Sequence, residues 1–285
     1  MAHDQRKGFV GEVVSKTLRT MTEGANPKTV VIRSSILALA SFISSIPYFY
    51  YLTVNFGFFP LGSSARDIWV FIAGELFLTS VLVFLCALVG FSFSSRYGLP
   101  GLGRAKEALG FLPHLIVIGG FMVFASYFLF DRFFVESSPL LYPRGAIYLF
   151  GFPLKGAFTD EAVLRLCLTT IGLGFFQAVF RGFDAIKKRR GWLPQKDVAK
   201  VAGMSPDKAV AVFFVSALAS LYTLRVFAFS GVEFGFEYLP CMGIFLSFAS
   251  NLVLSYFFVT RGLLYSMALH FLFGMKYFLV ALSVG

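Results

Sequence analysis

Long apolar runs dominate the chain, and short polar segments separate them. A helix needs about 20 mostly apolar residues to cross a bilayer. Runs of that length lie at about 34–53, 68–94, 109–130, 160–182, 207–229, 238–259 and 262–283. The apolar stretch 145–158 is broken by glycine and proline, which favours a re-entrant segment or an extra amphipathic helix. The pattern therefore predicts an all-α polytopic membrane protein with about seven transmembrane helices.

Composition agrees with this class of protein. Hydrophobic residues make up 57% of the 285 residues and charged residues 14%, whereas soluble domains carry roughly 25% charge. After the spans are placed, no stretch remains for a separate soluble domain. We expect a basic cytoplasmic arm at 1–33 and one transmembrane domain at 34–285. The arm has no apolar core of the signal-peptide type, so we expect no cleaved signal.

The net charge of +10 is distributed as an orientation signal. Basic and non-basic segments alternate along the chain, which places the N-terminus in the cytoplasm and the C-terminus on the opposite side. Nucleic acid is therefore not an expected partner. The most basic run predicts an anchor at the cytoplasmic surface that binds anionic lipid; it consists of Lys187, Lys188, Arg189 and Arg190.

Two boundaries have the residues of a helix start. Ser205-Pro206-Asp207 combines an N-cap residue, a proline and a first-turn acid, and predicts that the fifth span begins there. Thr159-Asp160-Glu161 predicts the start of the fourth span in the same way. Acids in a first turn interact favourably with the exposed amides, and Arg165 lies one turn after Glu161 on the same helix face.

Ionisable residues within spans are costly, so each is a candidate functional residue. Glu75, Arg225 and Lys276 share a layer in the outer half of the membrane. We expect Glu75 to pair with Arg225 or Lys276, either as a structural ion pair or as part of a polar cavity. His114 and His270 are single histidines within spans: His114 lies on the inner side, and His270 lies deep in the last span.

The sequence favours no metal or other cofactor. Glu161 and His270 are the only weak candidates for metal ligands, because a single intramembrane histidine is more often bonded to a carbonyl than to a metal. Cys86, Cys167 and Cys241 all lie in apolar runs, which predicts buried thiols rather than a disulfide framework. The zincin, serine-hydrolase and nucleotide-binding motifs are absent.

Two short motifs resemble the CPBP family, the CAAX-protease and bacteriocin-processing membrane proteins. Asp160-Glu161-xxx-Arg165 is similar to the family's Glu-Glu-xxx-Arg motif, and the segment 258–264 followed by His270 is similar to its last two spans. The resemblance covers about 145–280. It implies a CAAX-protease-like helical bundle, peptidase chemistry at Asp160, Glu161, Arg165 and His270, and a prenylated peptide as substrate.

The chain departs from the family motifs at three places. The first acid is Asp160 instead of glutamate. The family's middle histidine is missing, because no histidine occurs between positions 115 and 269; Tyr222 or its neighbours occupy that stretch. Gly274 occupies the position of the family's asparagine. General-base and oxyanion groups each contribute several orders of magnitude to rate. These losses predict an inactive or repurposed relative.

Three functions follow from these observations. The first is a CPBP-like pseudoprotease that binds a membrane protein, a transmembrane segment or a lipid tail, or that serves as a subunit of a complex. The second is an active intramembrane endopeptidase that uses Asp160, Glu161 and His270, with His114 as the candidate to replace the lost histidine. The third is a small-solute transporter or channel built on the layer of Glu75, Arg225 and Lys276.

Overall fold

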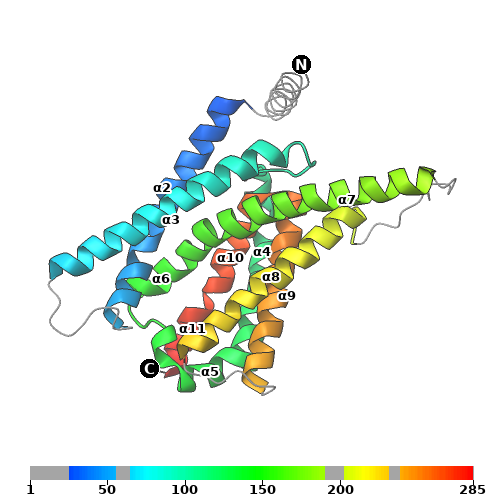
Figure 1. The fold of residues 1–285 in the computed structure, drawn as a ribbon. Coiled ribbons are helices and arrows are strands. Elements are labelled where there is room, and N and C mark those ends of the chain that lie inside the picture. Colours follow the sequence, from blue (N-terminus) through cyan, green and yellow to red (C-terminus); the bar gives the residue numbers. More distant parts are fainter. Residues whose placement is uncertain (1–25, 56–64, 190–201, 231–237, 285) are drawn as a thin grey trace.

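The computed structural model describes residues 26–55, 65–189, 202–230 and 238–284. These residues form helices joined by short turns, with no strand among them. Figure 1 shows the α-helices α2 (Pro27–Asn55), α3 (Ala65–Ser94), α4 (Ala105–Ser126), α5 (Arg132–Ser137), α6 (Ala146–Lys155), α7 (Thr170–Arg189), α8 (Pro206–Ser230), α9 (Tyr238–Arg261), α10 (Leu263–Gly274) and α11 (Lys276–Val284). Three further segments are the π-helices η1 (Tyr127–Asp131) and η3 (Gly156–Thr169) and the 3-10 helix η2 (Pro139–Leu141).

Six helical segments among the described residues are long and apolar enough to cross a membrane. They are Pro27–Asn55, Ala65–Ser94, Ala105–Glu136, Ala146–Phe183, Tyr238–Arg261 and Leu263–Ser283. The predicted helical membrane protein is thus supported. The predicted span 207–229 coincides with α8, whose described side chains end at Leu221, so a seventh span stays a prediction. The start predicted at Pro206 is confirmed.

The predicted helix start at Thr159 is wrong. The chain is helical without a break from Ala146 to Arg189, through α6, η3 and α7, so Asp160 and Glu161 lie inside a helix. Gly156 does not interrupt it, and Pro153 is also accommodated within α6. The stretch 145–158 is therefore the first part of the fourth span rather than a separate re-entrant loop. The acids lie in η3, a π-helix with i→i+5 hydrogen bonds. Such segments are rare in proteins, and those that occur are often at functional sites.

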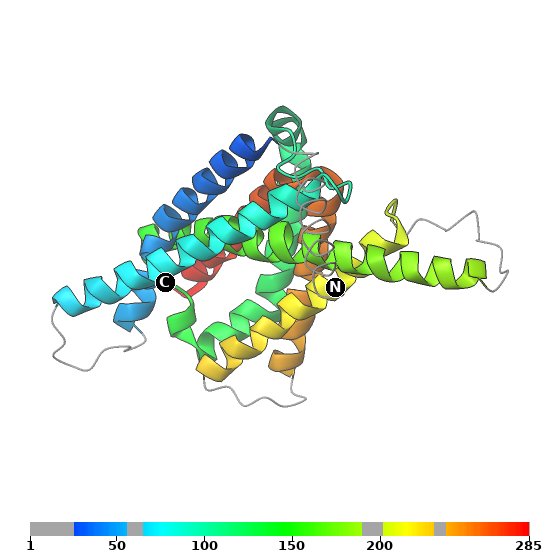
Figure 2. The same ribbon diagram turned by 45° about the horizontal axis from the view of Figure 1, so that its top comes forward.

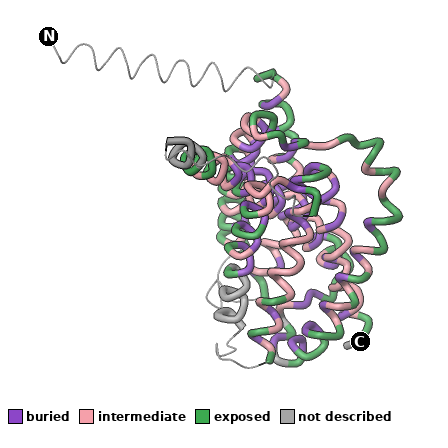
Figure 3. The backbone as a smooth tube through the Cα atoms, turned by 90° about the vertical axis from the view of Figure 1, so that its right-hand side faces the viewer, coloured by how far each residue is buried: buried purple, intermediate pink, exposed green. Residues whose placement is uncertain are grey.

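Helix α10 lies at the centre of the bundle, where it contacts α4, α6, η3 and α9 (Figure 1). Around it, α2 packs along α3, and α8 packs along α9. The end of α7 extends beyond the other helices in both ribbon views (Figure 2). Exposed residues cover the outer sides of the helices, and buried residues concentrate between them (Figure 3). Many of the exposed side chains are large and apolar, which is expected where the outer surface faces lipid.

Two glycines fix the start of α10. Gly103 and Gly262 have φ angles of +79° and +106°, a region that favours glycine. A Cβ atom at Gly262 would lie 2.7 Å from the amide nitrogen of Gly103, so side chains are excluded where the two turns meet. The amide of Leu263 donates to the carbonyl of Gly101 over 2.9 Å. The loop before α4 therefore sets the position of α10 and of His270 on it.

The predictions of buried cysteines and of a lipid anchor have different outcomes. Cys86 and Cys167 are buried as expected, but Cys241 is exposed on α9, because an apolar helix turns one side to the lipid. The predicted lipid anchor lies outside the described side chains: Lys187, Lys188 and Arg189 belong to the end of α7, and Arg190 follows it.

Candidate functional site

A carboxylate–imidazole pair lies at the centre of the site. Oε1 of Glu161, on η3, lies 2.7 Å from Nδ1 of His270, on α10. With an ionised carboxylate, which only accepts hydrogen bonds, Nδ1 is the donor. The side chain of Glu161 is 0% exposed and that of His270 20% exposed. The structure therefore brings together two residues that the motif resemblance had grouped and that are 109 positions apart in the chain.

Arg165 extends the pair to a third helix. Its Nε lies 3.7 Å from Oε1 of Glu161, and its side chain is also 0% exposed. Its Nη2 donates to Oδ1 of Asn251 on α9 at 2.5 Å. The amide nitrogen of Asn251 in turn donates to the carbonyl oxygen of Ser247 at 2.8 Å. We call Glu161, Arg165, Asn251 and His270 the central network; it joins η3 to α9 and α10.

The central network places a carboxylate beside a guanidinium. Groups of opposite charge are tolerated inside a membrane bundle when they face each other. Three buried atoms of the network have no hydrogen-bond partner among the described residues: Oε2 of Glu161, and Nε and Nη1 of Arg165.

Asp160 lies outside the central network, although it is adjacent to Glu161 in the sequence. Its Oδ1 accepts a 2.6 Å hydrogen bond from Nζ of Lys155, and its side chain is 36% exposed. Neighbouring residues on a helix do not face the same direction. The residue before Asp160, Thr159, forms a 2.6 Å hydrogen bond between its hydroxyl and that of Ser41 on α2. The two acids therefore do not act at one site.

Close packing encloses the imidazole. A Cβ atom at Gly156 would lie 2.7 Å from Nε2 of His270, so that edge of the ring rests against the backbone of η3. One turn later on α10, a Cβ atom at Gly274 would lie 2.7 Å from Cβ and 2.9 Å from Cα of Pro153. The position that carries asparagine in the CPBP motif is thus a helix contact in which only glycine fits.

His114 does not replace the missing histidine. It is exposed on α4 and stacks on Phe111 with ring centroids 4.6 Å apart. The guanidinium of Arg261 also contacts Phe111, at 5.1 Å from the centroid of the ring. The side chain of Tyr222 lies outside the described residues.

A second buried cluster, which the sequence did not predict, surrounds Asp131 at the end of η1. Oδ1 of Asp131 accepts hydrogen bonds from Nζ of Lys276 at 2.9 Å and from the hydroxyl of Tyr142 at 2.7 Å. Its Oδ2 accepts one from Ser126. Asp131 is fully buried. Each carboxylate oxygen is therefore satisfied, and we call these four residues the outer network.

The outer network corrects the predicted pairing of Glu75 with Lys276. Lys276 pairs with Asp131 instead, since equal depth along two helices does not place two side chains on facing sides. The other predicted partner of Glu75, Arg225, has a side chain outside the described residues. Lys276 therefore does not join Glu75 in the ion pair that the sequence predicted.

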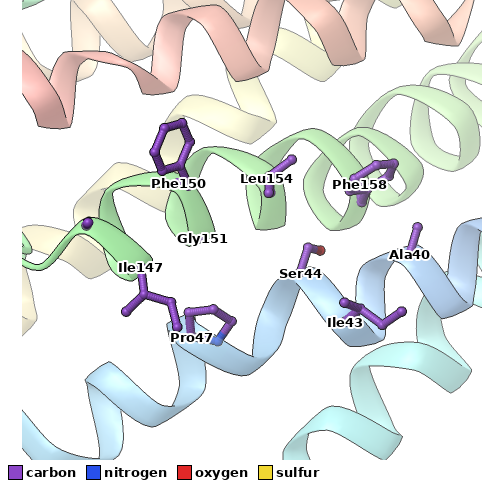
Figure 4. Close-up of a pocket in the computed structure, with 10 residues that line it drawn as sticks. Ala40, Ile43, Ser44, Pro47, Ile147, Phe150, Gly151, Leu154 and Phe158 are labelled. Atoms are coloured by element: carbon purple, nitrogen blue, oxygen red, sulfur yellow. The ribbon is translucent and has the colours of Figure 1, made fainter.

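An apolar groove of about 660 Å³ runs between α2 and α6, next to η3. Figure 4 shows the side chains of both helices along it. Its walls consist of Ala40, Ile43, Ser44, Pro47, Ala146, Ile147, Phe150, Gly151, Leu154 and Phe158. Ile43 and Ile147 are exposed at its edge, while Gly151 contacts Pro47 at its base. Neither Glu161 nor His270 lines this groove.

The described residues contain no group of three or more histidine, cysteine, aspartate or glutamate side chains able to hold a metal ion. Glu161 and His270 are two residues only, and Oε1 of the first is bonded to Nδ1 of the second. Comparison with known proteins finds no match for this chain among protein-family models, curated proteins or solved structures. Fold and site together define a multi-pass helical membrane protein with two buried charge networks.

Proposed function

We propose that this chain is a CPBP-like membrane protein without peptidase activity that binds one hydrocarbon chain of a membrane lipid. The binding site is the groove between α2 and α6. The observation that carries the proposal is an apolar groove near a central network in which Glu161, Arg165 and His270 contact one another. The CPBP resemblance itself rests on the motifs of Asp160-Glu161-xxx-Arg165 and His270.

The loss of peptidase chemistry follows from how the motif residues are used. Asp160 pairs with Lys155 and leaves Glu161 as the one acid of the network. Nδ1 of His270 is bonded to Glu161, and Nε2 rests against Gly156. Gly274 provides no donor. A general base and an oxyanion donor must both reach the reacting group, and these side chains are held by one another instead.

The groove has the properties of a site for a hydrocarbon chain. Both of its helices belong to candidate membrane spans, so the medium at its open side is lipid. Its walls are apolar apart from Ser44. Its volume falls within the range of about 300–1,000 Å³ found for small-ligand sites. Pro47 against Gly151 closes the base, so an occupant lies along the two helices.

One observation favours the alternative of an active intramembrane peptidase. Oε2 of Glu161 is buried and has no hydrogen-bond partner among the described residues. It lies on the carboxylate that also holds His270, which is where an acid–base group would bind a reacting water. Measurement of peptide turnover separates the two functions, because only the peptidase requires Glu161 to exchange protons.

Binding in the groove can be tested with a lipid that carries a photoactivatable diazirine in one acyl chain. We expect cross-links in proteoliposomes to concentrate on the segments 40–47 and 146–158. Ile147→Trp places an indole in the groove and should lower that labelling severalfold. Ile116→Trp is the matched control, since Ile116 is exposed on α4 and lines no part of the groove.

Equal labelling of α4 and of the groove helices would contradict the proposal, as would labelling that Ile147→Trp leaves unchanged. Either result would show that the lipid touches the outer surface without a specific site.

We further propose that the N-terminus faces the cytoplasm and the C-terminus the opposite side, because basic segments alternate along the chain. In a variant with its native cysteines replaced by serine, Arg190→Cys should react with an impermeant maleimide only from the cytoplasmic side. Gly285→Cys should react only from the other side. Labelling of position 190 from outside would reverse the orientation.

A further inference from the structure

Two buried thiols meet at the contact between α3 and η3. Cys86 lies on α3, and Cys167 lies in η3, six positions after Glu161. Both are free and buried, and the two side chains lie close enough to interact with each other. Neither cysteine takes part in the central or the outer network, so the pair is an independent feature of the fold.

The helices that carry the two thiols touch through their backbones. A Cβ atom at Gly90 would lie 2.4 Å from the carbonyl oxygen of Leu166, and so it would clash with the backbone of η3. Gly90 is one turn from Cys86 on the same face of α3, and Leu166 directly precedes Cys167. A disulfide requires two Cα atoms about 4.4–6.8 Å apart, a separation that only closely packed helices provide.

We propose that Cys86 and Cys167 form a site of reversible oxidation, at which a disulfide links α3 to η3. The oxidant is a small membrane-soluble two-electron acceptor of the quinone or azo class. The two thiols lose two protons and two electrons as the S–S bond forms, and the acceptor takes up both, becoming a quinol or a hydrazine. A dithiol reductant reverses the reaction by thiol–disulfide exchange.

The bond would act on the helix that carries the central network. Cys167 and Glu161 belong to the same π-helix, so a covalent link at Cys167 restricts the motion of η3 relative to α3. The oxidised protein should therefore unfold at a higher temperature in detergent than the reduced protein. The effect should be reversed by dithiothreitol.

Thiol counting after oxidation in the membrane tests the proposal. The chain has three cysteines. After treatment with diamide, an azo oxidant, and denaturation, we expect free thiols to fall from three to one. Mass spectrometry should find the peptide containing Cys86 linked to the one containing Cys167. In Cys241→Ser, the matched control, the count should fall from two to none, whereas in Cys86→Ser it should stay at two.

Three free thiols after oxidation of the wild type would overturn the proposal. A disulfide between two copies of the chain through the exposed Cys241, with Cys86 and Cys167 left as free thiols, would also overturn it. The rise in unfolding temperature should disappear in both Cys86→Ser and Cys167→Ser; if either variant retains it, the link does not stabilise the contact of α3 with η3.

Discussion

Replacing Arg165 with methionine should lower the free energy of unfolding in detergent by about 3–5 kcal/mol, the usual cost of removing one partner of a buried ion pair. The change leaves Glu161 without its cation and Asn251 without its donor, in a part of the bundle where both charged side chains are 0% exposed. Thermal or denaturant unfolding of the purified protein measures the loss.

The control for this prediction is Arg104→Met. Arg104 pairs with Glu107 at 2.8 Å, but the two side chains are 83% and 54% exposed. Loss of such a surface pair should cost less than about 1 kcal/mol. The double variant Glu161→Gln/Arg165→Met should be more stable than the sum of the two single losses predicts, because the remaining side chains are neutral. Strictly additive losses would show that the two residues do not interact.

Replacing Lys276 with methionine should also cost about 3–5 kcal/mol, because it leaves the buried carboxylate of Asp131 with hydroxyl donors but no cation. Adding Asp131→Asn should recover part of this loss, since a neutral amide at position 131 needs no counter-charge. The unfolding of both single variants and of the double variant gives the coupling directly.

Glu75→Gln serves as the reference for Lys276→Met. The sequence alone pairs Glu75 with Lys276, whereas the structure pairs Lys276 with Asp131. The losses from Glu75→Gln and Lys276→Met should therefore add within the usual limit of about 0.5 kcal/mol for independent sites. A larger coupling between these two than between Asp131 and Lys276 would contradict the outer network.

The helices could be predicted from the sequence because lipid leaves the backbone few alternatives. A chain segment that crosses a bilayer must satisfy its own amides and carbonyls, and a run of about 20 apolar residues does so as a helix. The start of α8 was equally predictable from Ser205-Pro206-Asp207. The start of the fourth span was not, because Thr159 and two acids resemble a cap even when α6 continues into η3.

The central network was predicted in part. Glu161, Arg165 and His270 came from the motif resemblance, and the structure brings them together. Asn251 was missed, although one amide inside an apolar span is a recognised signal for contact between membrane helices. The separation of Asp160 from Glu161 depends on the direction of each side chain around η3, which the spacing of two adjacent residues does not determine.

The outer network could not be found from spacing. Asp131 follows an apolar run and looks like the first residue of a loop, but η1 and α5 continue the helix past it and bury it. Lys276 was assigned by its depth along one uninterrupted helix. α10 ends at Gly274 and α11 begins at Lys276, so the regular helix is interrupted at Met275 and depth alone could not give the partner of Lys276.

The central claim is that Glu161 and His270 join helices instead of hydrolysing peptides. Its most direct test is the turnover of a prenylated CAAX peptide by the purified protein in proteoliposomes, beside the variants Glu161→Gln and His270→Gln. We expect no turnover above that of empty liposomes from any of the three, together with a lower unfolding temperature for both variants. Turnover by the wild type that both substitutions abolish would contradict the claim and establish the peptidase.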